Sequence, residues 1–183
     1  MERKIRSPIK RKVLLLLEAG LVLGDRFHKR RRLNLKALSR AWRGINRSEL
    51  AYALRDFRYR RLVDYREQND GSIKIELSEL GRRRVLRFKV EEMTLSKAKK
   101  WDGRWRVVFF DVPEKKRKGR DALRQKLREL GFHEWQKSVF VYPHPCRDEV
   151  DFIVEFFELR PYVRYAELTA PTNEAELRLR FNL

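Results

Sequence analysis

The 183-residue chain carries 45 Lys+Arg against 26 Asp+Glu, a formal net charge of +19 at pH 7, and is long enough for one large domain or two small ones. Its single cysteine, Cys146, excludes an internal disulfide, and its three histidines lack the spacing of zinc ligands. The apolar run at residues 13–17 is too short to cross a bilayer, and no signal-peptide cleavage site follows it. We therefore expect a cytoplasmic protein without a membrane partner.

The positive charge is concentrated in the first half of the chain. Residues 1–90 hold 26 Lys+Arg against 10 Asp+Glu, whereas the remaining residues hold 19 against 16. A surface this basic attracts polyanions, and DNA or RNA is the commonest such partner, ahead of anionic membrane. A charge run can also be a solvated face, but such a face rarely needs so large an excess. We therefore expect a nucleic acid as the partner.

The first half opens with two predicted helices. Ser7 caps the first and Pro8 begins it, because Ser accepts hydrogen bonds from free amides and Pro fits a first turn. Residues 24–32, which include a basic cluster, are expected to form a loop. Asn34 then caps a short second helix that Gly44 closes.

A third helix is predicted to begin at Asn46. With Glu49 three residues on, Asn46 makes a start similar to a capping box. An apolar stripe at helical spacing then faces the core. The opposite face carries five candidate DNA contacts, which are Arg47, Ser48, Tyr52, Arg55 and Tyr59.

A β-hairpin and a further helix follow. Residues 62–67 and 73–77 alternate between apolar and polar side chains, and the Asn-Asp-Gly-Ser segment at residues 69–72 is strong turn chemistry. This order predicts a winged helix-turn-helix, in which the third helix enters the major groove of double-stranded DNA. Many winged helices bind proteins instead, but the charge excess favours DNA. Further candidate DNA contacts are Arg66 and Lys74 on the wing and Arg30, Arg31 and Arg32 in the preceding loop.

The second half is predicted to have the order β-α-β-β-α-β. Residues 106–110 form a compact β-branched and aromatic run that ends on Asp111. Two strands and two amphipathic helices follow, and residues 162–168 form the last strand. This is the ferredoxin-like arrangement, with both helices on one face of an antiparallel sheet.

The first helix of this half also carries a row of cations. A row at helical spacing is a candidate for auxiliary phosphate contacts, and equally for a solvated face, because this half has an excess of only three positive charges. The candidate contacts are Lys116, Arg120 and Arg124.

The last nine residues alternate without error between apolar and polar side chains. The pattern at residues 175–183 predicts an extra C-terminal strand, which must pair with the edge of its own sheet or of a second subunit's sheet. We favour the second subunit, and therefore expect a homodimer through the C-terminal domain.

Two segments carry a family resemblance. WDGRWRVVFFDVPEKKRKGRDALRQKLRELGF, followed by QKSVFVYPHP, resembles the central domain of PaaX-type transcriptional repressors. The basic winged helix before them matches that family's N-terminal domain, so the resemblance covers roughly residues 7–168. PaaX-type repressors continue into a further C-terminal domain, which we expect this chain to lack, and its effector is therefore unknown.

The same central domain is similar to the small dimeric nuclease subunit of CRISPR spacer acquisition (Cas-two). This resemblance implies that Asp111 matches an aspartate that faces its copy in the second subunit and shares a divalent cation with it. Asp111 is thus the candidate catalytic and metal-binding residue, with Mg²⁺ or Mn²⁺ as the cofactor. The alternative, which we favour, is that Asp111 only accepts hydrogen bonds from turn amides, since hydrolysis usually needs several placed groups.

The sequence therefore predicts an α+β protein in three parts. These are a winged helix DNA-binding domain at residues 1–90, a linker at residues 91–100 and a ferredoxin-like dimerisation domain at residues 101–183. The favoured function is that of a homodimeric transcriptional regulator that binds double-stranded DNA and needs no cofactor to do so. The alternatives are a divalent-metal-dependent endonuclease and a DNA-holding subunit of an integration or repair complex.

Overall fold

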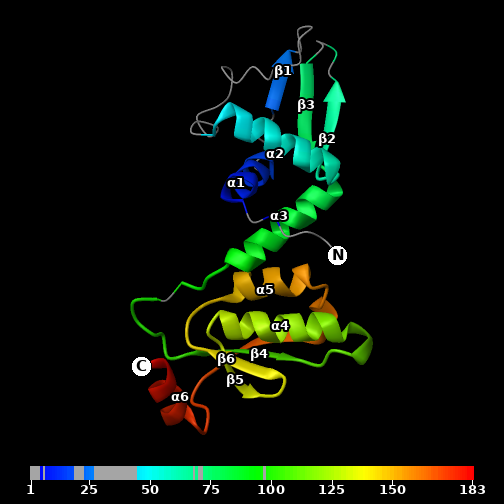
Figure 1. The fold of residues 1–183 in the computed structure, drawn as a ribbon. Helices are drawn as coiled ribbons and strands as arrows, with labels where there is room; N and C mark the ends of the chain where they lie inside the picture. The colour runs from blue at the N-terminus through cyan, green and yellow to red at the C-terminus, as the bar shows by residue number, and fades with distance from the viewer. Residues whose placement is uncertain are drawn as a thin grey trace. The chain divides into compact units, whose positions relative to one another are not determined.

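The computed structural model describes residue 5 and residues 7–18, 23–26, 45–67, 69, 72–96 and 98–183. The protein is a mixed α+β chain that divides into two compact units, Met1–Glu91 and Glu92–Leu183 (Figure 1). Each unit contains one antiparallel sheet, of three strands in the first unit and four in the second. The α+β class predicted from the sequence is confirmed.

The first unit packs its helices against the three-stranded sheet. Apolar side chains from the helices and from the last two strands share one core cluster. Its elements, in chain order, are α1 (Pro8–Glu18), β1 (Leu23–Arg26), α2 (Arg47–Tyr59), β2 (Val63–Glu67), β3 (Ser72–Leu77) and α3 (Glu79–Glu92). The strands lie side by side in the order β1-β3-β2.

Helix α2 begins and faces the core as its sequence predicts. The side-chain oxygen of Asn46 accepts a hydrogen bond from the backbone N–H of Ser48 at 3.0 Å, which satisfies one of the free amides of the first turn. Leu50, Leu54 and Phe57 are buried on one side of the helix. Because this apolar stripe must stay buried, the orientation of the opposite face of α2 is fixed as well.

The prediction of a loop at residues 24–32 is wrong for residues 24–26, which lie in strand β1. Gly24 lies in β1, where it pairs with Lys74 of β3. The sequence of β1, Leu-Gly-Asp-Arg, has no strand pattern of its own, so its conformation depends on pairing with a strand distant in sequence. The expected second helix, from Asn34 to Gly44, lies outside the described residues.

The second unit has the predicted order β-α-β-β-α-β. Its strands lie in the order β5-β6-β4-β7, which is the order of the ferredoxin-like arrangement. The elements are β4 (Trp105–Phe110), η3 (Glu114–Lys116), α4 (Arg117–Glu129), β5 (His133–Gln136), β6 (Val139–Tyr142), α5 (Arg147–Phe156), η4 (Arg160–Tyr162) and β7 (Val163–Leu168).

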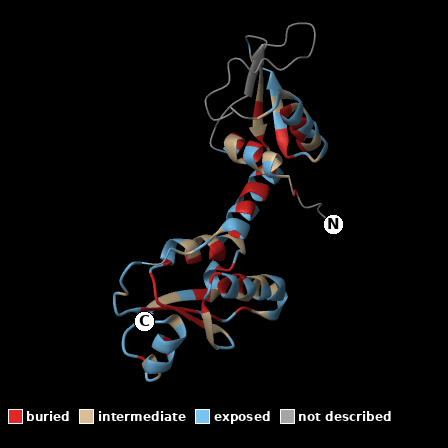
Figure 2. Cartoon of the chain, turned by 60° about the vertical axis from the view of Figure 1, so that its left-hand side comes forward, coloured by how far each residue is buried: buried red, intermediate tan, exposed pale blue. Residues whose placement is uncertain are grey.

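Helices α4 and α5 cover one face of this sheet. Leu127 of α4 and Ile153 of α5 belong to the same core cluster as Phe140 of β6. Figure 2 shows the result, with exposed residues along the outer side of α4 and buried residues in the strands beneath it. The two helices therefore leave the opposite face of the sheet to other parts of the chain.

The predicted C-terminal strand is wrong, because this segment forms the helix α6 (Glu174–Phe181). Helix α6 packs on the sheet face opposite to α4 and α5, where Leu177 joins a cluster with Trp105, Val107 and Val141. In a strand, Leu177 and Leu179 would point to the same face, but the side chain of Leu177 is 1% exposed and that of Leu179 is 80% exposed. The apolar residue that shares the buried side with Leu177 is Phe181, four residues on.

The composition of the segment explains why it forms a helix and not a strand. Ala, Glu, Leu and Arg are strong helix formers, and they make up seven of the eight residues of α6. Glu174 and Arg178 form an ion pair at 3.1 Å across one turn. Acidic residues lie in the first turn and basic residues in the last, which suits the helix dipole. Helix propensity and packing together thus outweigh the alternation of apolar and polar residues that predicts a strand.

Cys146, immediately before α5, is buried in the core of the second unit. Burial raises the pKa of its thiol to about 12, although Tyr165 donates a hydrogen bond that acts in the opposite direction. Such a thiol stays protonated at neutral pH and behaves as a small apolar side chain. Among the helices that the structure describes, none is long and apolar enough to cross a membrane.

Candidate nucleic-acid interface on helix α2

Four of the predicted DNA contacts form one exposed stripe on α2. Ser48, Tyr52, Arg55 and Tyr59 follow one another at spacings of four, three and four residues, so they lie along one side of the helix. The side chain of Tyr52 is 60% exposed and that of Tyr59 is 90% exposed. Tyrosines this exposed contribute nothing to the core, and with Arg55 between them they form a surface with aromatic and cationic groups.

Contacts with α1 hold one end of this stripe. The Lys10 ammonium lies 4.6 Å from the centroid of the Tyr52 ring and donates a hydrogen bond to the Asp56 carboxylate at 2.8 Å. Asp56 also accepts a hydrogen bond from Arg60 at 2.9 Å. Burial disfavours ionisation, but the hydrogen bonds from Lys10 and Arg60 outweigh it and keep the pKa of Asp56 below its usual value. The Tyr52 ring is therefore positioned by a fixed cation.

The two wing cations face each other across the hairpin. Arg66 of β2 and Lys74 of β3 are paired residues in the sheet register. Both contact Glu76, which lies 3.7 Å from Arg66 Nε and 2.5 Å from Lys74 Nζ. The hydrogen bond from Lys74 lowers the pKa of Glu76. Residues 63–77 as a whole hold two cations against four Asp+Glu, so the hairpin has no surplus of positive charge, and the roles of Arg66 and Lys74 as DNA contacts stay predictions.

Four predicted DNA contacts are not placed by the structure. The side chain of Arg47 is not described, although its backbone begins α2. Arg30, Arg31 and Arg32 lie outside the described residues. Their proposed roles stay predictions.

The candidate phosphate contacts of the second unit all have partners within the chain. Lys116 donates a hydrogen bond to the Glu158 carbonyl at 3.0 Å. Arg120 pairs with Glu114 at 3.1 Å, and Arg124 pairs with Glu134 at 2.6 Å. Glu134 lies on β5, so its ion pair joins α4 to the sheet. A phosphate at this row would have to compete with these carboxylates, and its role as a DNA contact stays a prediction.

Asp111 lies exposed just beyond the end of β4. Its backbone N–H donates a hydrogen bond to the Tyr162 carbonyl at 3.1 Å. Its side chain borders an open hollow of about 470 Å³ with Phe109, Ser138 and Arg164. Within the described part of the chain, no three or more His, Cys, Asp or Glu side chains are grouped so as to hold a metal. A cation at Asp111 would therefore need further ligands from water, nucleic acid or a second copy of the chain.

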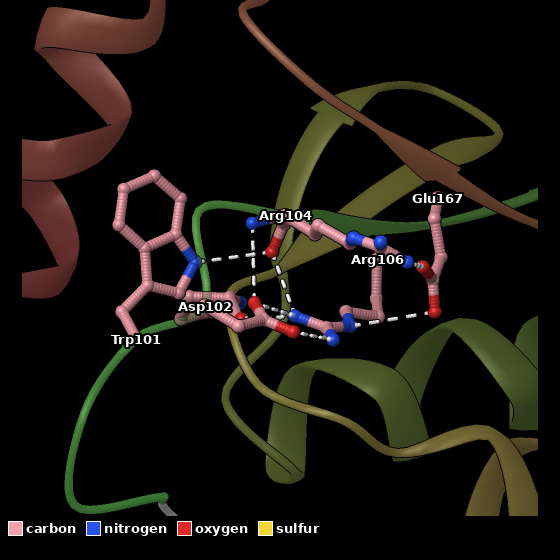
Figure 3. A network of polar contacts seen from close by, with 6 residues as sticks. Trp101, Asp102, Arg104, Arg106 and Glu167 are labelled. Carbon is pink, nitrogen blue, oxygen red and sulfur yellow. Dashed lines mark hydrogen bonds and ion pairs between the residues drawn. The ribbon is translucent and has the colours of Figure 1, made fainter.

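A buried charge that the sequence pattern did not reveal lies at the start of β4. The Arg106 guanidinium is 4% exposed and meets the Asp102 carboxylate, with Nη1 and Oδ1 2.7 Å apart (Figure 3). It also donates hydrogen bonds to the carbonyls of Arg104 and Pro143, both at 2.8 Å. The hydrogen bond from Arg106 lowers the pKa of Asp102 to about 2. This network fixes the loop before β4 to the sheet.

Comparison with known families gives a match within the second unit. Residues 98–179 match the family model of the PaaX protein central Cas2-like domain. A search of curated proteins found no match to the chain. The matched residues span most of the second unit, from the loop before β4 into α6. The second unit is therefore similar to the PaaX central Cas2-like domain, and the predicted resemblance of this chain to the PaaX-type family is confirmed over these residues.

Proposed function

We propose that this protein is a transcriptional regulator of the PaaX type that binds double-stranded DNA through helix α2. The observation that carries the proposal is the exposed stripe of Ser48, Tyr52, Arg55 and Tyr59 in a half of the chain that has 26 Lys+Arg against 10 Asp+Glu. A helix of this kind fits the major groove, where hydroxyl, guanidinium and aromatic groups contact base edges and phosphates. A regulator acts where the DNA is, so we expect it in the cytoplasm.

The first unit supports a winged helix assignment by its order of elements. Among the described residues, helix α1, the short strand β1, helix α2 and the β2–β3 hairpin occur in this order, and β1 pairs with the second strand of the hairpin. In this assignment α2 is the recognition helix and the hairpin is the wing. Arg66 and Lys74 would then approach the phosphate backbone beside the groove.

We further propose a homodimer formed through the second unit, but not by exchange of a terminal strand. Helix α6 lies on its own sheet, so the terminal segment offers no strand to a partner. Support for another dimer surface comes from the part of the same sheet face that α6 leaves open, where Phe109 is 42% exposed. A two-fold dimer predicts two recognition helices and a palindromic DNA site.

Binding to duplex DNA tests this proposal directly. We expect a labelled duplex from the region upstream of the protein's own gene to bind more tightly than a random duplex, with affinity that falls steeply as salt rises. We expect chelation of divalent cations to leave binding unchanged. Equal affinity for the upstream and random duplexes would contradict the regulatory role.

Variants on α2 test which face binds. We expect Arg55→Gln and Tyr59→Ala to weaken binding to the upstream duplex, each by about 1–3 kcal/mol for a base contact. Arg83→Gln is a matched control, because Arg83 is an exposed arginine of the first unit that lies on α3 and pairs with Glu79. If Arg83→Gln weakens binding as much as Arg55→Gln, general charge rather than α2 determines the affinity.

A further inference from the structure

A hollow of about 230 Å³ lies between α5 and the segment formed by η4 and β7. Valine side chains from α5 and β7 form its buried floor. Its wall carries three arginines, Arg147, Arg160 and Arg164, against a single carboxylate, Asp151. The hollow belongs entirely to the second unit, so it is independent of the proposed DNA interface on α2.

Arg164 is held in place without being neutralised. Its Nη1 donates hydrogen bonds to the carbonyls of Val163 at 2.9 Å, Pro161 at 3.0 Å and Arg160 at 3.5 Å. Among the described residues, no carboxylate forms an ion pair with Arg164, and its Nε and Nη2 have no hydrogen-bond acceptor. The backbone therefore orients this guanidinium while two of its three nitrogens keep their donors for a ligand.

The two other arginines share the one carboxylate of the wall. Asp151 accepts a hydrogen bond from Arg160 Nη1 at 2.6 Å, and its other oxygen lies 3.8 Å from Arg147 Nε. Arg160 also lies 3.7 Å from Glu155, and the Arg147 guanidinium lies 5.6 Å from the centroid of the Tyr165 ring. Asp151 thus compensates for only part of the cationic charge of the wall.

We propose that this hollow binds a phosphate group. Guanidinium groups present donors in a planar fork that matches phosphate oxygens, and a phosphate has enough acceptors to serve several arginines at once. The phosphate can come from a DNA backbone or from a small phosphorylated molecule, since both offer the same oxygens. Asp151 is the competitor, because it occupies donors that the phosphate would use.

Titration of the full chain with inorganic phosphate tests the site. Arginine Nε–Hε signals in NMR separate this hollow from the basic first unit, so we expect saturable shifts at Arg164 and Arg147. Arg164→Gln is expected to weaken phosphate binding by about tenfold or more, as for loss of a charge-assisted hydrogen bond. Asp151→Asn is expected to strengthen it, because it removes the competing carboxylate.

Two further variants keep the test decisive. Arg164 also braces the turn before β7, so Arg147→Gln, at a side chain that is 72% exposed, serves where Arg164→Gln fails to fold. Arg117→Gln on α4 is the control, because Arg117 is similarly exposed but does not line the hollow. Absence of a saturable shift in the wild type, or equal phosphate affinity in the wild type and in Arg147→Gln, would overturn the proposal.

The source of the phosphate follows from a second arm with duplex DNA. If the DNA backbone occupies the hollow, Arg147→Gln lowers DNA affinity and reduces the salt slope by about one. If a small phosphorylated molecule occupies it, DNA affinity is unchanged while phosphate binding is weakened. Both results support the site, and because the phosphate titration contains no DNA, its outcome is separate from that of the proposed function.

Discussion

The ion pair between Arg106 and Asp102 is partly buried, and its two members are not equivalent. Arg106 is shielded from water and keeps two backbone carbonyls as acceptors, whereas the side chain of Asp102 is 44% exposed. Removal of Asp102 leaves a buried guanidinium with fewer acceptors, which costs more than the loss of a surface ion pair. Because the position of Asp102 is partly open to solvent, water limits this loss of stability.

We expect Asp102→Asn to lower the free energy of unfolding by about 1 kcal/mol at pH 7. The pKa of Asp102 is about 2 in the folded protein and 3.8 ordinarily, so its stabilising contribution is complete above about pH 4 and disappears as the pH falls towards 2. Urea unfolding of both proteins at several pH values measures this difference. Asp111→Asn, at an exposed carboxylate of the same unit, is the control, and a stability difference that does not shrink below pH 4 would contradict the assignment.

Asp111 decides between the regulator and the nuclease alternative. We expect duplex DNA incubated with the wild type and Mg²⁺ or Mn²⁺ to remain intact, and Asp111→Ala to bind DNA like the wild type. Gel analysis of the incubated duplex and a binding titration measure the two outcomes. Metal-dependent cleavage that disappears in Asp111→Ala would instead support the nuclease, whereas cleavage that persists in the variant would come from a contaminant.

At the scale of elements, two leucine substitutions in α6 test whether this segment forms a helix or a strand. We expect Leu177→Ala to lower the free energy of unfolding by about 2–4 kcal/mol, since it removes a buried side chain, and Leu179→Ala to change it by less than about 0.5 kcal/mol. Chemical denaturation of both variants measures the contrast. In a strand the two leucines would share a face, so equal effects would restore the strand interpretation.

A helix or strand can be predicted from the sequence where the residues that determine its conformation lie within the segment itself. Asn46 and the apolar stripe from Leu50 to Phe57 are enough to define α2, and the exposed face with Tyr52 and Tyr59 follows from the same periodicity. Prediction fails where contacts with residues distant in sequence determine the conformation of a segment. Strand β1 exists through its pairing with β3, and the buried side of α6 is set by contact with Trp105.

The same distinction applies to the candidate sites. The row Arg120 and Arg124 is visible in the sequence, but its carboxylate Glu134 comes from a strand, so the pairing depends on the tertiary fold. The three arginines of the phosphate hollow come from α5, η4 and β7. No local spacing links them, and the excess of arginine in the chain hides them among many solvated ones.

At the scale of the whole molecule, the dimer proposal depends on the open part of the sheet face at Phe109. We expect Phe109→Glu to convert a dimer to a monomer, because a charge in an apolar interface is costly, and to weaken binding to a palindromic site more than to a half-site. Light scattering on a sizing column and DNA titrations measure these effects. Leu179→Glu, at an exposed leucine on α6, is the control, and unchanged mass in Phe109→Glu would exclude this surface.

The buried thiol of Cys146 gives the second unit an internal reporter. It is the only cysteine of the chain, and its raised pKa keeps it protonated and unreactive while the core is closed. A thiol reagent therefore modifies it only when the unit opens, so the labelling rate follows the opening equilibrium of this half alone. In the folded protein, Cys146 would therefore not react with thiol dyes used to label engineered surface cysteines.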